Sequence, residues 1–195
     1  MALNFPASAL IVIDVQNDFC PGGALAVKGG DGVTEPLNRL SGLFAANGGR
    51  VIATQDWHPE DHVSFRDLWP VHCVQGSFGA GFHASLDLKP ACLIVRKGFR
   101  RGLDSYSAFF ENDRETSTGL DGFLKALSID TLVLGGLATD YCVLYSALDA
   151  ARLGYKTIVV SDAVRAVGSP AGSTERALEA LKQAGVTLAP SGEIQ

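Results

Sequence analysis

Short continuous apolar segments alternate along the chain with segments in which apolar residues recur every three or four positions. The first kind is typical of strands buried on both faces, and the second of amphipathic helices. The pattern predicts strands at 9–13, 51–54, 92–95, 131–135 and 157–160, and a short sixth strand at 186–188. It predicts helices near 33–44, 120–127, 143–151 and 177–184, three of which are followed by glycine.

Alternation of buried strands with helices indicates an α/β fold, a three-layer sandwich in which helices flank both faces of a mostly parallel sheet. The length of 195 residues favours a single domain, 1–195. Functional sites in such folds form beyond the carboxyl ends of the strands. The segment 56–90 has little periodicity and is rich in Gly, Pro, His and aromatic residues. A loop this long inside a compact domain is usually functional.

Composition excludes some classes of partner. The formal charge of −5 disfavours binding to nucleic acid or to an anionic membrane. The sequence has no apolar run of membrane-spanning length and no signal-peptide pattern at its start. Its four cysteines are widely spaced, without a CxxC pair. Free thiols in the cytoplasm are therefore expected, rather than two disulfides.

Three of the four histidines fall within fifteen residues, and an aspartate precedes them. Asp56, His58 and His62 follow the second predicted strand, and His72 comes ten residues later. Imidazole and carboxylate groups in such a cluster suit Zn²⁺, Mn²⁺ or Fe²⁺. A set of surface turn residues is the alternative, because Pro, Glu and Asp lie among them. His83 stands apart and is expected to be structural.

Three other residues deliver reactive groups at the ends of predicted strands. Asp14 follows the first strand, and Lys97 follows the third. Cys142 comes after the fourth strand and a glycine turn, with Thr139 as the expected helix N-cap. A thiol in the first helical turn is favoured as thiolate by the helix dipole. Each residue alone also fits a structural role, as a turn cap, a solvated lysine or a small core residue.

Together they would form a nucleophilic site, in which the carboxylate takes the proton of the thiol and the ammonium stabilises the anion. Backbone amides of the 137–139 turn and of Cys142 would make the oxyanion hole. No nucleotide-binding motif, GxGxxG after a strand or GxxxxGK[ST], is present.

Several segments resemble the nicotinamidases, also called pyrazinamidases, of the isochorismatase-like hydrolase superfamily. The segments are IDVQNDFCPGGAL at 13–25, TQDWHP at 54–59 with His62, WPVHC at 69–73, KG at 97–98 and GLATDYCV at 136–143. The resemblance runs from about residue 9 to 188, and the metal motif distinguishes nicotinamidases from other members of the superfamily. One departure is Tyr141, where some members carry histidine beside the nucleophile.

The resemblance implies a role for each matched position. Asp14, Lys97 and Cys142 would be the catalytic triad, and Asp56, His58 and His62 the metal ligands, with His72 matching a histidine that lies at the metal in some members. Phe19, Trp69 and Tyr106 would wall the substrate ring. A cis peptide is expected before Ala138, with the amides of Ala138 and Cys142 facing the oxyanion.

The implied reaction is hydrolysis of nicotinamide to nicotinate and ammonia in NAD salvage, through a cysteine thioester. One divalent ion, Zn²⁺ before Mn²⁺ or Fe²⁺, would anchor the ring nitrogen. The resemblance leaves the oligomeric state open, and a homo-oligomer is possible. Three alternatives remain at this point: a sibling hydrolase acting on another small amide or on isochorismate, a metallohydrolase in which Cys142 is structural, and an inactive binding module.

Overall fold

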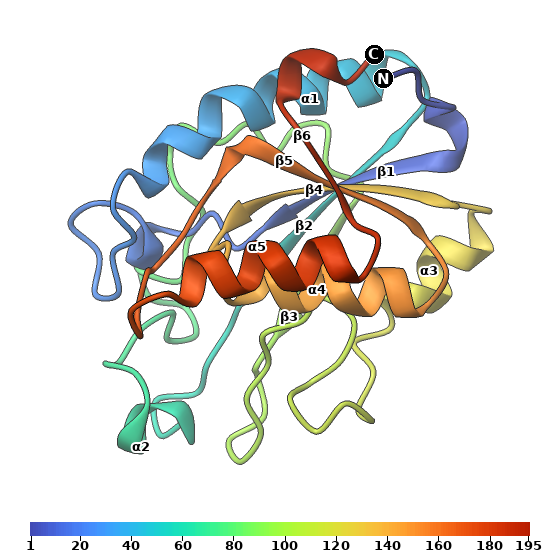
Figure 1. Cartoon of the computed structure of the whole chain (residues 1–195). Coiled ribbons are helices and arrows are strands. Elements are labelled where there is room, and N and C mark those ends of the chain that lie inside the picture. The colour runs from blue at the N-terminus through green and yellow to red at the C-terminus, as the bar shows by residue number, and fades with distance from the viewer.

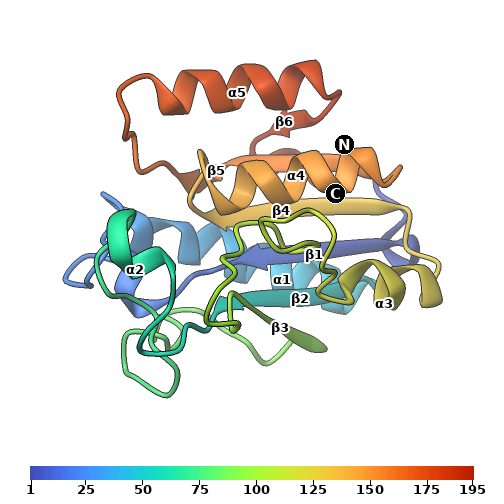
Figure 2. The ribbon, with the colours of Figure 1, turned by 90° about the horizontal axis from the view of Figure 1, so that it is seen from below.

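A parallel sheet forms the middle layer of the molecule. The computed structural model describes residues 1–195, apart from the side chain of Asp67. Six strands lie in the order β3-β2-β1-β4-β5-β6, and each neighbouring pair is parallel (Figure 2). They are β1 (Ser8–Ile13), β2 (Arg50–Asp56), β3 (Leu93–Lys97), β4 (Thr131–Leu137), β5 (Lys156–Arg165) and β6 (Thr187–Ala189).

Helices cover both faces of the sheet, which confirms the predicted three-layer α/β sandwich. Helix α1 (Thr34–Ala46) lies on one face, and α3 (Leu120–Ala126), α4 (Cys142–Arg152) and α5 (Ser173–Gln183) lie on the other (Figure 1). The short helix α2 (Ser64–Asp67) belongs to the long segment between β2 and β3. Within the described chain, no helix combines the length and the apolar character needed to cross a membrane.

The central strands are buried on both sides, which explains their continuous apolar sequences. Every residue of β1 and of β4 is buried. Leu10 and Val12 point into the core beneath α1, and Ile11 and Ile13 into the core beneath α4. Because successive side chains of a strand face opposite sides, both registers of β1 must be apolar.

Strands β2 to β6 end one to five residues beyond the apolar runs that predict them. β5 continues to Arg165 although Ser161 and Asp162 are exposed. The reason is that its pairing with β4 resumes at Val164 after a register shift. The glycine turn expected after residue 135 is wrong, because β4 continues through Gly136 to Leu137. A Cβ on Gly136, whose φ is +128°, would collide with the backbone of Ile13. Glycine therefore lets β4 approach β1 closely at the end where the site forms.

The strand order places a crevice at the centre of the sheet. β1 and β4 are neighbours, and the chain leaves β1 for α1 on one face and β4 for α4 on the other. At such a switch point the two connections diverge, and ligands bind beyond the carboxyl ends of these strands. Asp14 directly follows β1, and Cys142 begins α4 after β4. The topology alone thus brings two of the predicted reactive groups to the same crevice.

Candidate active site

The structure brings the predicted carboxylate, ammonium and thiol into one cluster. Lys97 is the last residue of β3, and its Nζ lies 2.8 Å from Oδ2 of Asp14 and 3.5 Å from Sγ of Cys142. Asp14 and Lys97 are fully buried, and Cys142 is 6% exposed. Burial excludes the solvated lysine considered from the sequence, and the Asp14 carboxylate contacts Thr54 and Lys97 instead of capping a turn. Bulk water therefore has little access to these three groups, and a proton can pass directly between them.

Local backbone features hold Asp14 in place. Its φ of +47° lies in the left-handed region, which costs a non-glycine residue about 1–3 kcal/mol. Thr54 of β2 stabilises this arrangement, because its Oγ1 donates to Oδ1 of Asp14 at 2.6 Å and accepts from the amide of Asp14 at 3.2 Å. Oδ2 is left facing Lys97.

Lys97 balances two carboxylates, not one. Its Nζ also lies 2.5 Å from Oδ1 of Asp56 and donates to the carbonyl of Ser105 at 3.0 Å. Burial opposes its charge, but Asp14 and Asp56 outweigh burial and hold its pKa well above the ordinary value. Burial raises the pKa of Asp14 despite Lys97, whereas Lys97 and then His58 overcome burial at Asp56 and lower its pKa. The ammonium thus links the proposed nucleophilic group to the metal-binding residues.

The surroundings of Cys142 disfavour the thiolate that the helix dipole is expected to favour. Burial raises the pKa of Cys142 well above the ordinary value, and Asp14 and Asp56 raise it further against the effect of Lys97. Cys142 does begin α4 as expected, but the N-cap is Tyr141 and not Thr139. The thiol therefore needs a base at the moment of reaction, and the raised pKa of Asp14 suits that carboxylate to take the proton.

Two backbone amides of cavity-lining residues have no hydrogen-bond acceptor among the described residues. Among the described residues, neither Ala138 nor Cys142 donates its N–H to a protein acceptor. The amide of Thr139 donates to the carbonyl of Arg165 at 2.8 Å, which removes it from the set expected for the oxyanion hole. The expected cis peptide before Ala138 is confirmed, between Leu137 and Ala138.

Asp56, His58 and His72 form a group suited to a divalent cation. One ligand atom from each lies within 4.8 Å of the others, and all three residues are buried. Nδ1 of His58 donates to the carbonyl of Gly98 at 2.8 Å, and Nδ1 of His72 donates to the carbonyl of Pro70 at 2.8 Å. Each ring therefore keeps the lone pair of Nε2 for a metal, in the arrangement typical of histidine ligands. The donor set fits Zn²⁺, Mn²⁺ or Fe²⁺.

His62 lies beside this group but is oriented differently. Its ring stacks on that of His58 at a centroid distance of 4.2 Å, although the turn between them is not helical. Nε2 of His62 donates to the carbonyl of Leu103 at 3.2 Å, and Nδ1 contacts the hydroxyl of Ser64 at 2.6 Å. Both nitrogens are thus engaged. His62 groups with His58 and Asp104, a buried aspartate with one oxygen lacking a hydrogen bond among the described residues.

The metal-binding group is fixed by residues outside it. The side-chain amide of Gln16 donates to the carbonyl of Asp56 at 2.9 Å and accepts from its amide at 2.8 Å, so the end of β2 is held on both sides. A Cβ on Gly98, whose φ is +61°, would collide with the ring of His58. A glycine is needed there because its carbonyl must reach that same ring.

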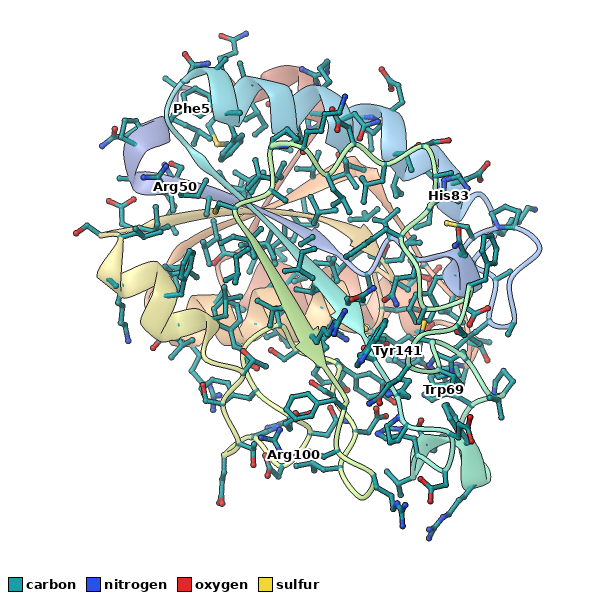
Figure 3. All side chains as sticks on the ribbon, turned by 180° about the vertical axis from the view of Figure 1, so that it is seen from behind. Phe5, Arg50, Trp69, His83, Arg100 and Tyr141 are labelled. Carbon is teal, nitrogen blue, oxygen red and sulfur yellow. The ribbon has the colours of Figure 1, made fainter. Side chains whose placement is uncertain are left out.

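Cys142 and the metal-binding group Asp56, His58 and His72 open on a cavity. It is lined by Phe19, Leu25, Val27, Asp56, His58, Trp69, His72, Asp104, Tyr106, Leu137, Ala138, Tyr141, Cys142 and Val167. The three aromatic residues expected to wall a substrate ring are thus on its surface. Figure 3 shows Trp69 beside Tyr141, and their rings meet edge to face at 4.9 Å. His83, expected to be structural, lies away from them in the same view and is absent from the lining.

Sequence reasoning missed two polar or aromatic residues of the cavity. Tyr141 was noted only as a departure beside the nucleophile, yet its ring lies 5.6 Å from that of Tyr106. Asp104 sits in a segment with no strand and no helical periodicity, in the sequence LDSYS at 103–107. A carboxylate flanked by apolar and aromatic residues was the available signal. Spacing alone could not connect Asp104 to histidines about forty residues away.

Fold and site together define an α/β protein with a buried Asp–Lys–Cys cluster at the switch point of a parallel sheet, next to a candidate metal-binding group, an arrangement suited to nucleophilic catalysis. Comparison with known proteins agrees with this class. The model of the isochorismatase domain matches residues 8–193. The chain belongs to the isochorismatase family.

Named nicotinamidases and pyrazinamidases are among its similar proteins. A nicotinamidase of Acinetobacter baylyi is 44% identical over 205 residues, covering 95% of this chain and 94% of the relative. PnC1 from L. infantum, solved in complex with nicotinate, superposes with a TM-score of 0.93 at 37% identity, covering 100% of this chain and 98% of that one. A pyrazinamidase of Pyrococcus horikoshii, solved with zinc, has a TM-score of 0.85 at 38% identity, covering 95% and 99%.

Proposed function

We propose that the chain is a nicotinamidase, which hydrolyses nicotinamide to nicotinate and ammonia and also accepts pyrazinamide. The observation that carries the proposal is the contact of Lys97 with both Asp14 and Cys142, 2.8 and 3.5 Å away, where Cys142 lines a cavity with aromatic walls. Flat apolar walls suit an aromatic ring, and a few positioned polar groups give specificity. The names of the similar proteins support the same activity.

The proposed chemistry uses a covalent thioester. Asp14 accepts the proton of Cys142 as sulfur attacks the carboxamide carbon, and Lys97 stabilises the developing thiolate. The amides of Ala138 and Cys142 hold the oxyanion. The C–N bond then breaks, and Asp14 returns its proton to the departing ammonia. A water molecule next loses a proton to Asp14 and attacks the thioester, which releases nicotinate and restores the thiol.

Asp56, His58 and His72 would hold one divalent ion, with Zn²⁺ preferred and Mn²⁺ or Fe²⁺ also suited. His62 would support the site from the side of Asp104. The bound ion would supply a Lewis-acid anchor for the ring nitrogen of the substrate. In this scheme Phe19, Trp69 and Tyr106 orient the ring, so that its carboxamide points toward Cys142.

The test is ammonia release from nicotinamide and from pyrazinamide by the purified protein, compared with Cys142→Ala. We expect turnover by the wild type and a loss of at least about 10³-fold in the variant, because removing a nucleophile abolishes the covalent route. Equal rates for both proteins would rule out the thioester. Activity that is lost on chelation but survives alkylation of Cys142 would instead favour attack by a metal-bound hydroxide.

A further inference from the structure

A loop between β5 and α5 closes one side of the substrate cavity. Val167 lines the cavity and packs on the core beneath α1. Inside the loop, the amide of Ser173 donates to the carbonyl of Pro170 at 2.9 Å, a bond that does not attach the loop to the cavity. Its position must therefore be set by contacts with another part of the molecule.

One buried carboxylate supplies most of those contacts. Asp140 is 6% exposed, and its Oδ1 accepts from the amide of Val167 at 2.9 Å. Its Oδ2 accepts from the amide of Gly168 at 2.9 Å and from the hydroxyl of Ser173 at 2.5 Å. The three donors span the loop from its cavity-lining residue to the first residue of α5. Hydrogen bonds to an ionised acceptor are the stronger kind.

The same short segment of chain carries the nucleophile. Asp140 lies two residues before Cys142, and the intervening Tyr141 donates its hydroxyl to the carbonyl of Ser169 at 2.6 Å. The ring of Tyr141 lines the cavity and contacts the ring of Trp69 edge to face, at a centroid distance of 4.9 Å. The turn before α4 thus contacts the loop through two consecutive residues, Asp140 and Tyr141. A shift of the loop would alter the wall at Val167 while the Asp14–Lys97 pair stays in place.

From this geometry we propose that Asp140 is a positioning residue that sets the size of the substrate pocket, by holding the 166–172 loop against it. The inference rests on the proposed nicotinamidase activity. Asp140 contacts neither the thiol nor the cavity; it acts through Val167. A purely structural carboxylate would affect stability alone, whereas a residue that sets the pocket must change affinity and ring selectivity.

Asp140→Asn tests the proposal, because asparagine has nearly the same shape as aspartate. Its side-chain nitrogen, however, cannot accept a hydrogen bond. At least one loop amide then loses its acceptor, and one hydrogen bond to a charged group corresponds to about a 10- to 100-fold change in an equilibrium. We expect KM for nicotinamide to rise about tenfold, with kcat changing less. We also expect kcat/KM for ring-methylated nicotinamides to rise relative to that for nicotinamide, because the wall can retreat.

Asp162→Asn is the matched control. Asp162 also accepts from a backbone amide and a hydroxyl, both of Ser191, at 2.7 and 2.6 Å, but it lies outside the cavity lining. We expect this variant to lower the unfolding midpoint without changing KM or ring selectivity. If Asp140→Asn behaves like Asp162→Asn, with unchanged KM and selectivity, the inference is wrong. If Asp140→Asn does not fold, Ser173→Ala removes one of the three bonds and should give a smaller rise in KM.

A wild type that releases no ammonia would contradict the proposed function without deciding the role of Asp140. That role is then measured by the rate at which iodoacetamide alkylates Cys142, followed by mass spectrometry. Asp140→Glu keeps the charge but moves the carboxylate by one methylene group. Faster alkylation in both Asp140 variants, and not in Asp162→Asn, would support the inference. Equal rates in all of these proteins would overturn it.

Discussion

Replacing Lys97 by methionine would remove the only positive charge that contacts two buried carboxylates in the described site. The Nζ of Lys97 lies 2.8 Å from Asp14 and 2.5 Å from Asp56, and all three side chains are at most 6% exposed. Methionine matches the length of the lysine stem without its charge. The variant therefore leaves both carboxylates buried without their shared partner, and removes the group that stabilises the thiolate of Cys142.

The expected loss of stability follows from that burial. Removing one partner of a buried ion pair costs about 3–5 kcal/mol. For a domain of this size, each kcal/mol lowers Tm by about 2–4 °C, so Tm should fall by about 6–20 °C. Without Lys97, the pKa of Asp14 rises further. A carboxyl group with a raised folded pKa loses stability as pH increases through that pKa, so the deficit should be larger at pH 8 than at pH 5.

The assay is urea unfolding of metal-free protein at both pH values, with Asp14→Asn/Lys97→Met as the matched variant. Removing one uncompensated carboxylate should return part of the loss, about 0.5–3 kcal/mol, because the two residues are in contact. Neither variant should release ammonia at a measurable rate. The reasoning would be refuted if Lys97→Met were as stable as the wild type at pH 8, or if the double variant were no more stable than Lys97→Met.

Three further predictions address the metal-binding group, the base and the cavity wall. His62→Ala should lower zinc affinity by about 10- to 100-fold, as expected for a residue that supports a metal ligand, and His72→Ala should lower it by more. Metal titration with a competing chelator measures both affinities. A larger loss for His62→Ala than for His72→Ala would contradict the orientations described. Thr54→Val should lower kcat at nearly constant KM and cost about 1–3 kcal/mol, because Asp14 loses its donor; Thr54→Ser should restore both. Trp69→Leu should raise KM about tenfold through the loss of aromatic contacts, and an unchanged KM for both nicotinamide and pyrazinamide would exclude Trp69 from the substrate wall.

Much of the fold could be read from local patterns in the chain. β1 and β4 are buried on both faces, so their sequences had to be continuous apolar runs, and such runs can be recognised without a structure. The ends of elements were less predictable. β5 continues past the polar residues Ser161 and Asp162 because of its pairing with β4. Pairing between distant segments cannot be recognised from the local sequence pattern.

The candidate site divides in the same way. The sequence determined which reactive groups lie at strand ends, since Asp14, Lys97 and Cys142 each follow or end an apolar run and parallel strands share one carboxyl edge. Only the tertiary structure decided that Lys97 contacts Asp56 as well as Asp14, and that the nitrogens of His62 are already engaged. Hydrogen-bond direction and shared charge depend on the three-dimensional placement of residues far apart in the chain. Spacing along a sequence carries no information on either.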